Sequence, residues 1–260
     1  VAALIIRGDS LVGSNESAKG IQDYYNAMKC FNASDYDRCT FNASIFCREG
    51  YARRQQNQTE ALESLNNSIK LNRNLSDAWY WKGYIHNEQG KYDEANRELN
   101  EATKLKQWNG YFWLEKAYAL LMLNDSSKDS SKEAIRACNQ SIQLNPDNDY
   151  FWYYKGWILN DLGRYEEAYW ALENATNLDP NVGYYWSEKA FALFNLNRSD
   201  EAVQACVKSI QQDPDNAYYW YYKAWILNES GKCEEADQAL EEAIRLDAAY
   251  ESYRDELICL

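Results

Sequence analysis

Apolar and small residues recur along this chain with the spacing of paired helices. Within residues 147–180, aromatic residues fill the segment 150–161, Gly163 interrupts them, and an amphipathic segment follows over 165–178 before Pro180. Apolar residues three and four positions apart predict α-helices, and the glycine predicts a tight turn between them. This stretch is therefore predicted to form two helices joined by a turn.

The same block recurs through most of the chain. A small residue marks each second helix and a tryptophan marks most first helices, at Ala61, Ala95, Ala134, Ala168, Ala202, Ala236 and at Trp79, Trp113, Trp152, Trp186, Trp220. Every interval in both series is 34 residues, except one of 39 that carries an insertion beginning at Asp125. A fixed period of this length in a helix-turn-helix unit is typical of a solenoid, which buries its core between neighbouring repeats.

The repeated positions resemble the tetratricopeptide repeat (TPR) family. That family pairs a Trp with a small residue four positions later, and its second helix carries two small residues, a large apolar residue and a closing Pro. The block at 149–182 has all of these, at Trp152, Gly156, Ala168, Leu172, Ala175 and Pro180. One departure is systematic, because Lys stands where the family usually has Leu, at Lys82, Lys116, Lys155, Lys189 and Lys223. The resemblance implies an all-α, right-handed superhelical solenoid of about six helix-turn-helix repeats.

The resemblance covers roughly residues 42–250. It divides them into repeats without linkers: 42–75, 76–109, 110–148, 149–182, 183–216 and 217–250. Residues 1–15 begin apolar and continue with Gly, Ser and Asn, which predicts an extended N-terminal arm. Residues 16–41 are expected to form the second helix of a repeat that lacks its first, followed by a connector. Residues 251–260 are expected to form the first helix of a repeat that lacks its second, so a half-repeat is predicted at each end.

Two interpretations of these split ends stay open. Terminal helices of solenoids commonly act as caps. Alternatively, the C-terminal half-repeat of one molecule docks on the N-terminal half of the next, and a head-to-tail contact that does not close propagates into a filament. In that case the apolar residues 1–6 are expected to lie in a groove of the neighbouring subunit. The triplet Arg7-Gly8-Asp9 resembles a cell-adhesion motif, but three residues do not distinguish a motif from chance.

The chain is acidic, with a net charge of −13 and a pI near 4.7. Nucleic-acid binding and attraction to anionic membranes both need a basic surface, so neither partner is expected. No apolar run approaches the ~18 residues that a membrane-spanning helix needs, so no membrane span is expected in this chain.

The motif Asn-X-Ser/Thr is over-represented. It occurs at 11 of 25 Asn residues, whereas random placement of the 22 Ser and Thr residues predicts about 2. The positions are Asn15, Asn32, Asn42, Asn57, Asn66, Asn74, Asn124, Asn139, Asn174, Asn197 and Asn228. Because this motif accepts N-glycans in secreted and surface proteins, the excess predicts an extracellular or cell-surface glycoprotein. The alternative is a hydrated surface rich in Asn and Ser that carries no sugar.

Seven cysteines allow several arrangements. Cys138 and Cys206 occupy an apolar column of the second helices, so both are expected to be buried as small hydrophobic residues. Three others cluster near the N-terminus: Cys30, Cys39 and Cys47. One disulfide among these three is expected in a secreted protein. The odd count leaves at least one thiol for an intermolecular bond, and Cys259 at the tail is the candidate.

Catalytic groups are few. The single His, His86, stands at a core-side position where other repeats have Leu, so a structural role is expected. General acid–base and metal chemistry of the usual kinds lack a second His, and no phosphate-binding loop or nucleophile elbow occurs. We therefore expect a non-enzymatic protein without a metal or cofactor, apart from covalent N-glycans.

Aromatic residues are expected to line an inner groove. The resemblance implies that first helices face the concave side of the superhelix, which commonly holds a peptide. The inward columns contain Tyr80, Tyr84, Tyr118, Tyr153, Trp157, Phe191, Tyr221 and Trp225. The family's basic clamp for a peptide carboxylate is absent, and acidic residues such as Glu88, Asp161 and Glu229 stand nearby. The rings either hold an extended segment or a sugar, or pack only between repeats.

Two functional hypotheses follow. The first is an extracellular, N-glycosylated scaffold that assembles head to tail with other copies of itself. The second is a monomeric adaptor that binds a protein, peptide or glycan partner in the aromatic groove. Formation of filaments by the purified protein separates the two.

Overall fold

The computed structural model describes residues 1–14, 16–31, 35–123 and 128–254. Within these ranges the chain forms α-helices, one 3-10 helix and no β-strand, as the sequence predicts. The elements are α1 (Ala2–Gly13), α2 (Ser17–Cys30), α3 (Asp35–Arg53), α4 (Gln58–Leu71), α5 (Ser76–Glu88), α6 (Tyr92–Leu105), α7 (Gly110–Met122), α8 (Lys128–Leu144), α9 (Asp149–Asp161), α10 (Tyr165–Leu178), α11 (Gly183–Asn195), α12 (Ser199–Gln212), α13 (Ala217–Glu229), α14 (Cys233–Leu246) and η1 (Ala248–Tyr253).

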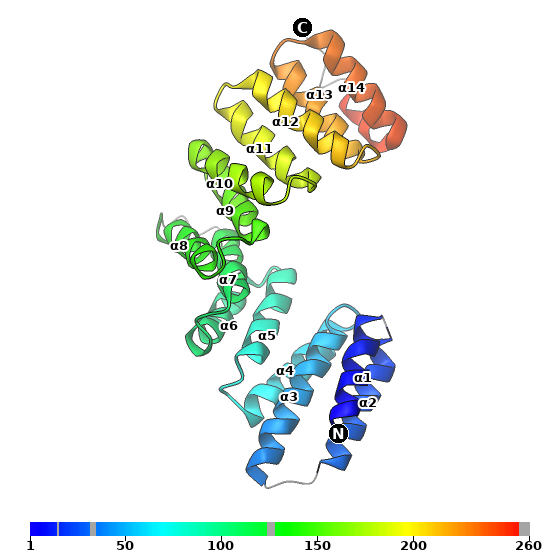
Figure 1. The fold of residues 1–260 in the computed structure, drawn as a ribbon, viewed down its shortest axis with the longest axis vertical. Coiled ribbons are helices and arrows are strands. Elements are labelled where there is room, and N and C mark those ends of the chain that lie inside the picture. The colour runs from blue at the N-terminus through cyan, green and yellow to red at the C-terminus, as the bar shows by residue number, and fades with distance from the viewer. Residues whose placement is uncertain (15, 32–34, 124–127, 255–260) are drawn as a thin grey trace. The chain divides into compact units, whose positions relative to one another are not determined.

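The helices belong to two compact units. Val1–Ala137 contains α1 to α7 and the start of α8, and Cys138–Leu260 contains the rest of α8 and the later helices. Within each unit consecutive helices pair side by side (Figure 1), α1 with α2, α3 with α4 and α5 with α6, then α9 with α10, α11 with α12 and α13 with α14. The first helices of neighbouring pairs also contact each other, as in α9, α11 and α13. The first helices therefore form a layer. Their side chains that point away from the second helices lie next to each other along this layer.

Small residues of the second helices form the core columns. The alanines that mark the 34-residue period are fully buried, with Ala236 at 1% exposure the least covered of them. Gly83 of α5 lies so close to α6 that a Cβ on it would come within 2.6 Å of the Leu99 Cγ atom. Close approach of this kind buries apolar surface inside each helix pair, which is the main source of its stability.

Four of the turns inside helix pairs use a left-handed backbone conformation. Gly90, Gly163 and Gly231 have φ values of 70°, 68° and 72°, and Asn197 takes the same place with φ 59°. Gly adopts this region without steric cost, and Asn tolerates it better than most residues. The interruption predicted at Gly163 is therefore confirmed.

The periodic tryptophans close the turns that precede the first helices. In each case the indole Nε1 donates a hydrogen bond of 2.7–2.9 Å to a backbone carbonyl oxygen six residues earlier, at Arg73, Gln107, Pro146, Pro180 and Pro214. Four of the five lysines that replace the family's Leu lie over these rings, 4.7–5.7 Å from the centroids: Lys116, Lys155, Lys189 and Lys223. Cation–π attraction explains why Lys is accepted in this column.

The prediction of an extended N-terminal arm is wrong, because residues 2–13 form α1. Gly8 and Gly20 let α1 and α2 approach closely, since a Cβ on Gly20 would lie 2.7 Å from the Gly8 carbonyl oxygen. Ile5 and Val12 of α1 then pack against a buried cluster that includes Tyr24. The helix predicted as an N-terminal half-repeat therefore has a partner helix.

The predicted connector and C-terminal helix also differ in part. Helix α3 begins at Asp35, so residues 35–41 belong to the first helix of the first repeat and not to a connector. At the other end a 3-10 helix covers Ala248–Tyr253, while residues 255–260 lie outside the described part of the chain. The helix expected over 251–260 thus stays a prediction beyond Tyr253.

Candidate functional site

The eight aromatic residues predicted for the groove all lie on first helices and are half-buried. Tyr80, Tyr84 and Tyr118 belong to the first unit, and the other five belong to the second: Tyr153, Trp157, Phe191, Tyr221 and Trp225. Each unit therefore carries its own set of rings.

Six of these eight rings contact a ring of another repeat, and for Tyr118 and Phe191 the contact is edge-on, to Tyr92 at 6.0 Å and to Tyr165 at 5.9 Å. Tyr80 stacks on Phe112 with centroids 4.6 Å apart, and Tyr153 stacks on Tyr185 at 4.9 Å. Two further rings behave in the same way, because Tyr221 contacts Tyr253 at 4.7 Å and Trp225 contacts Phe194 at 4.8 Å. For these last four rings the packing interpretation is the better one.

Trp157 and Phe191 line a cavity of about 390 Å³ in the second unit. We call it the Glu188 cavity; its lining residues are Trp157, Asn160, Asp161, Tyr165, Ser187, Glu188, Phe191, Tyr218 and Tyr222. They come from α9, α10, α11 and α13. The cavity thus combines aromatic surface with two carboxylates, and no lining residue is a Lys, Arg or His.

A hydrogen bond between successive first helices positions Glu188. The Asn160 side chain donates from Nδ2 to the Glu188 backbone oxygen and to Glu188 Oε2, both at 3.0 Å. Burial raises the pKa of Glu188 above its ordinary value, and the Asn160 amide partly offsets this effect. The carboxylate is therefore fixed in place by a neutral partner that brings no positive charge.

The first unit contains the same arrangement. Asn87 Nδ2 donates to the Glu115 backbone oxygen and to Glu115 Oε2, both at 3.1 Å. Burial raises the pKa of Glu115 to about 7. Burial raises the pKa of the Tyr84 phenol, and the nearby carboxylates of Glu88 and Glu115 raise it further. The Asn–Glu pair is thus a feature of the fold that occurs in both units.

Comparison of every second repeat reveals an alternation between two repeat types. Along the column of Glu188 the residues are Trp81, Glu115, Tyr154, Glu188 and Tyr222. Along the column of Asn160 they are Asn87, Leu121, Asn160, Phe194 and Asn228. A buried column alternates between large and small residues, with Ile85, Ala119, Ile158, Ala192 and Ile226. Glu115 and Glu188 occur only in alternate repeats, so the features common to all repeats do not predict them.

The predicted glycosylation sites differ in exposure. Asn57, Asn66, Asn74, Asn139, Asn174 and Asn197 are exposed. Asn42 and Asn228 are half-buried, and Asn228 occupies the column in which Asn87 and Asn160 are 4% exposed. The other three, Asn15, Asn32 and Asn124, lie outside the described residues.

Several hydroxyl groups of these motifs have a structural role. Ser68 Oγ donates to the Ala43 carbonyl oxygen at 2.7 Å, and Thr176 Oγ1 donates to the Leu172 carbonyl oxygen at 2.9 Å. Both side chains are buried, Ser68 at the second small column of its repeat and Thr176 one residue beyond that column. Part of the excess of Asn-X-Ser/Thr therefore has a packing explanation, which leaves the exposed Asn side chains as the informative members.

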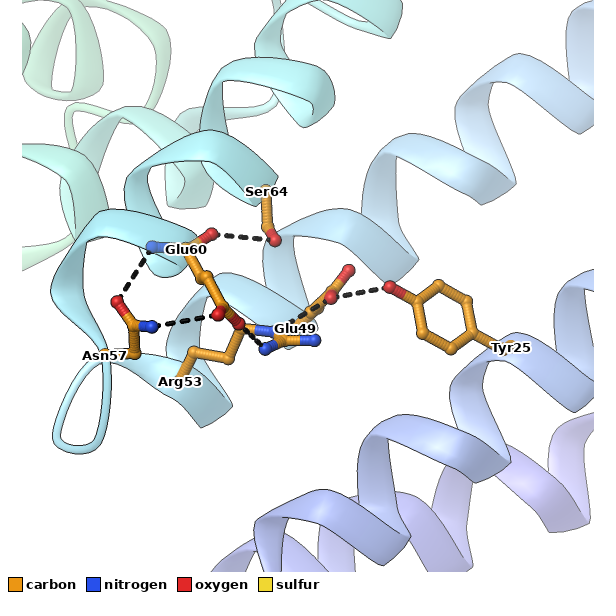
Figure 2. A network of polar contacts seen from close by, with 6 residues as sticks. All are labelled: Tyr25, Glu49, Arg53, Asn57, Glu60 and Ser64. Carbon is orange, nitrogen blue, oxygen red and sulfur yellow. Dashed lines mark hydrogen bonds and ion pairs between the residues drawn. The ribbon is translucent and has the colours of Figure 1, made fainter.

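Asn57 belongs to a polar network that joins α2, α3 and α4 (Figure 2). Its Oδ1 accepts a hydrogen bond from the Glu60 backbone N–H at 3.2 Å, and its Nδ2 donates to Glu60 Oε1 at 2.9 Å. Arg53 pairs with Glu60 and with the buried Glu49, which also accepts from Tyr25 Oη at 2.6 Å. Asn57 is therefore the N-cap of α4, and an N-linked glycan would leave one N–H on its amide.

The predicted N-terminal disulfide is not formed. Cys30, Cys39 and Cys47 are all free thiols, and Cys47 is buried. Cys39 and Cys47 lie eight residues apart on α3, a rise of about 12 Å, which exceeds the reach of a disulfide. Cys259 lies outside the described residues. The prediction that Cys138 and Cys206 are buried is confirmed, and burial raises the pKa of both thiols to about 12.

His86 has the structural role that its position predicts. It is 8% exposed, and its Nδ1 lies 2.7 Å from Glu98 Oε2. Lys82 pairs with the other oxygen of the same carboxylate at 2.9 Å. Within the described residues, no group of His, Cys, Asp and Glu side chains is arranged to hold a metal ion.

The Arg7-Gly8-Asp9 triplet is part of α1 and makes internal contacts. Arg7 pairs with the buried Asp23, and Asp9 accepts a hydrogen bond from Tyr24 at 2.7 Å. Asp9 also pairs with Arg48 at 2.7 Å, inside a cavity of about 480 Å³ in the first unit. Asp9 and Arg48 are paired with each other, and Asp77, the third charged lining residue, pairs with Lys106 at 3.7 Å, so this cavity makes a weaker candidate site than the Glu188 cavity.

Comparison with known proteins was made at the level of sequence and of fold. Family models described as tetratricopeptide repeats match residues 51–107, 137–169, 184–216 and 205–245, more than half of the chain. No curated protein has a matching sequence. Among the helices of the described ranges, none is long and apolar enough to cross a membrane.

Several solved structures share the fold. A tetratricopeptide repeat protein from Parabacteroides merdae aligns over 98% of both chains with a TM-score of 0.69 and 13% identity. TTC0263, a TPR protein from Thermus thermophilus, aligns over 71% of this chain and 98% of its own, with a TM-score of 0.58 and 18% identity. YrrB, described as having an unusual peptide-binding site, aligns over 75% of this chain and 99% of its own, with a TM-score of 0.56 and 18% identity. At these identities the likeness concerns the fold alone.

Proposed function

Because the chain belongs to the tetratricopeptide repeat family, we propose that it is a non-enzymatic adaptor that holds an extended segment of a protein partner in the Glu188 cavity. The fold is one that supports protein–protein interaction. The observation that carries the proposal is the cavity of about 390 Å³, in which Trp157 and Phe191 meet polar groups of three first helices. Concave sites with aromatic walls and a few polar groups are the usual form of a ligand site. The peptide-binding site named for YrrB supports the choice of a peptide.

Substitution of Trp157 tests this proposal. We expect Trp157→Ala to weaken retention of the protein on immobilised pools of short peptides by at least about tenfold, because a large ring is lost from the cavity wall. Trp170→Ala is the matched control, since Trp170 of α10 is 57% exposed and is not part of the cavity lining. Equal retention of the two variants would show that the cavity is not the binding site. Retention on immobilised oligosaccharides in place of peptides would favour the glycan alternative.

Head-to-tail assembly has less support than the adaptor function. The arm that was expected to dock on a neighbour is α1, and α1 packs on α2 of its own chain. The remaining argument for head-to-tail assembly is the C-terminal end, where a lone helix was expected after the last repeat. Sedimentation velocity over a range of concentrations tests it, and a single species near 30.4 kDa without glycans would exclude assembly.

A secreted, N-glycosylated form is a second proposal that a separate observation favours. Six motif asparagines are exposed, on helices and turns of both units: Asn57, Asn66, Asn74, Asn139, Asn174 and Asn197. Random placement does not account for the excess of motifs, and accessible Asn-X-Ser/Thr sites are modified in the secretory pathway. An extracellular or cell-surface location follows from this proposal.

Intact mass of the protein from its native source tests the second proposal. We expect heterogeneous species several kDa above 30.4 kDa that collapse to one mass after enzymatic removal of N-glycans. Site mapping is expected to find sugar on the exposed asparagines and least at Asn228, which occupies a packing column. A mass equal to that of the polypeptide would contradict the proposal and leave the adaptor function untouched.

A further inference from the structure

We propose that the Glu188 cavity binds the side chain of an arginine or lysine presented by an extended partner segment. The inference rests on the proposed function, because it assigns the chemistry of the partner that the same cavity takes. Carboxylates, polar atoms without a hydrogen-bond partner among the described residues and aromatic faces line the cavity. Each of these three features favours a positively charged ligand group.

The first argument is charge. Asp161 and Glu188 line the cavity, and among the described residues no cation is paired with Glu188. An ionised carboxylate that is partly removed from water and has only a neutral partner is unfavourable. A positively charged group in the cavity would supply the missing partner, whereas an acidic ligand would be repelled. The net charge of −13 of the whole chain attracts basic segments in the same way.

The second argument is hydrogen bonding. Asn160 is 4% exposed, and its Oδ1 accepts no hydrogen bond from any residue that the structure describes. The hydroxyl group of Tyr222, another lining residue, also has no hydrogen-bond partner within the described part of the chain. The Asn160 oxygen is a buried acceptor, and such acceptors are normally satisfied, so it favours a ligand with N–H groups. The Tyr222 hydroxyl can accept from the same ligand, although it can also donate. A guanidinium group has five N–H donors and an ammonium group has three, and neither has an acceptor.

The third argument is the aromatic wall. Trp157, Phe191, Tyr218 and Tyr222 line the cavity, and the rings of Tyr218 and Tyr222 stack with centroids 5.7 Å apart at 14°. Aromatic faces attract cations and also cover the aliphatic part of an Arg or Lys side chain. A site that combines rings with carboxylates thus suits both ends of such a side chain.

The arrangement recurs in the first unit, which makes an accidental cluster a poor explanation. Asn87 is also 4% exposed, and within the described ranges its Oδ1 also accepts no hydrogen bond. Glu115 is held by this amide as Glu188 is held by Asn160. The pairs lie two repeats apart in the sequence, at the positions where the repeat type alternates.

Peptide pools that differ at one position test the proposal. Acetylated and amidated peptides with apolar flanks and a central Arg, Lys, citrulline or Glu are immobilised, and the retained protein is measured. Citrulline keeps the shape of Arg without its charge. We expect the Arg and Lys pools to retain the protein at least about tenfold better than the citrulline pool, and the Glu pool to retain least.

Glu188→Gln removes the charge and keeps the acceptor for Asn160. We expect it to abolish the preference for Arg over citrulline, while Glu166→Gln, which removes an exposed charge of α10 outside the cavity, preserves it. Circular dichroism checks that the variant folds. If Glu188→Gln does not fold, Asp161→Asn at the exposed rim is measured in its place, and we expect it to lower the preference for Arg over citrulline about threefold.

Every outcome decides between the alternatives. Equal retention on the Arg and citrulline pools, or a preference that survives Glu188→Gln, would overturn the inference. If all pools are retained equally and Trp157→Ala still removes retention, the adaptor function stands and the cationic partner does not. If no pool is retained, both fail.

Discussion

Glu115 is a residue on which burial and a neutral amide act in opposite directions. Burial raises its pKa to about 7, and the hydrogen bond from Asn87 partly offsets this effect. Because the pKa is higher in the folded state than in the unfolded chain, the folded protein holds a proton that the unfolded chain has lost between about pH 4.5 and pH 7. The contribution of Glu115 to stability is therefore fully present below this window and is lost as the pH rises through it.

The first prediction follows from this sign. We expect the free energy of unfolding of Glu115→Gln to match wild type at about pH 4 and to exceed it at about pH 8, by at most about 3 kcal/mol, because the variant has no charge to bury. Urea denaturation at several pH values measures the difference. Glu63→Gln on the exposed surface of α4 is the control for the loss of a carboxylate that is not buried. A flat difference for Glu115→Gln would contradict the interpretation of the buried carboxylate.

Asn57 is the N-cap of α4 and also a predicted glycosylation site, and the two roles can be separated. As the N-cap of α4 it accepts a hydrogen bond from the Glu60 backbone, so Asn57→Ala is expected to lower the free energy of unfolding by about 1 kcal/mol in protein without glycans. Asn66→Ala removes a second Asn-X-Ser/Thr motif, at a solvent-exposed position in the middle of the same helix. It should change the free energy of unfolding by less than about 0.5 kcal/mol. Equal effects of the two substitutions in urea denaturation would exclude the capping role.

At the scale of the helix, the contact inside a pair depends on matched residue volumes. Gly83 faces Leu99, whereas Ala190 and Cys206 share one buried cluster. A larger residue on one helix is thus accompanied by a smaller one on its partner. Cys206 stands in place of Leu because the residue on its partner helix is Ala190 and not Gly. The sixth repeat, with Ala224 beside Leu240, does not follow this rule.

A double substitution tests the matched volumes. Gly83→Ala alone is expected to destabilise the protein by about 1–3 kcal/mol, since the new Cβ meets Leu99. The addition of Leu99→Cys should restore part of this loss, although Leu99→Cys alone leaves a cavity and is destabilising. Thermal or urea unfolding of the three variants gives the coupling energy. Additive effects would mean that the two positions do not compensate each other.

The helices that follow the period were predictable from sequence, and the N-terminal helix was not. Ala61 and its equivalents recur strictly, because each repeat buries the same column against its neighbour. Helix α1 has no such signal, since its packing depends on Gly8 meeting Gly20 of α2, a contact between residues that local preferences disfavour in helices. The disulfide prediction was wrong for a similar reason, because Cys47 lies in a helix core and not in an irregular segment.

The site was predictable only in part. The aromatic positions could be listed, but which rings pack between repeats and which line a cavity depends on neighbouring side chains, as the difference between Tyr153 and Trp157 shows. Glu188 could not be recognised from the pattern common to all repeats, because the equivalent residue of the next repeat is Tyr222. Comparison of alternate repeats identifies it.

For the whole molecule, the two repeat types predict how it responds to added repeats. Duplication of residues 149–216 adds one repeat of each type and preserves every kind of neighbour contact, so the midpoint of thermal unfolding should rise. Duplication of 183–216 alone puts two repeats of the same type side by side, with no Asn donor facing the second copy of Glu188, and the midpoint should rise less or fall. Calorimetry of the two variants measures this, and equal increases would show that the alternation has no energetic role.

The alternation also gives the chain a parity. A gain or loss of one 34-residue block inverts the sequence of types beyond that point, much as a frameshift changes every later codon, while a gain or loss of two blocks leaves it in phase. Changes in length that natural selection retains should therefore come in pairs. Each Asn–Glu contact joins two successive repeats, so the unit that is gained or lost in evolution would be this pair of repeats and not the single repeat.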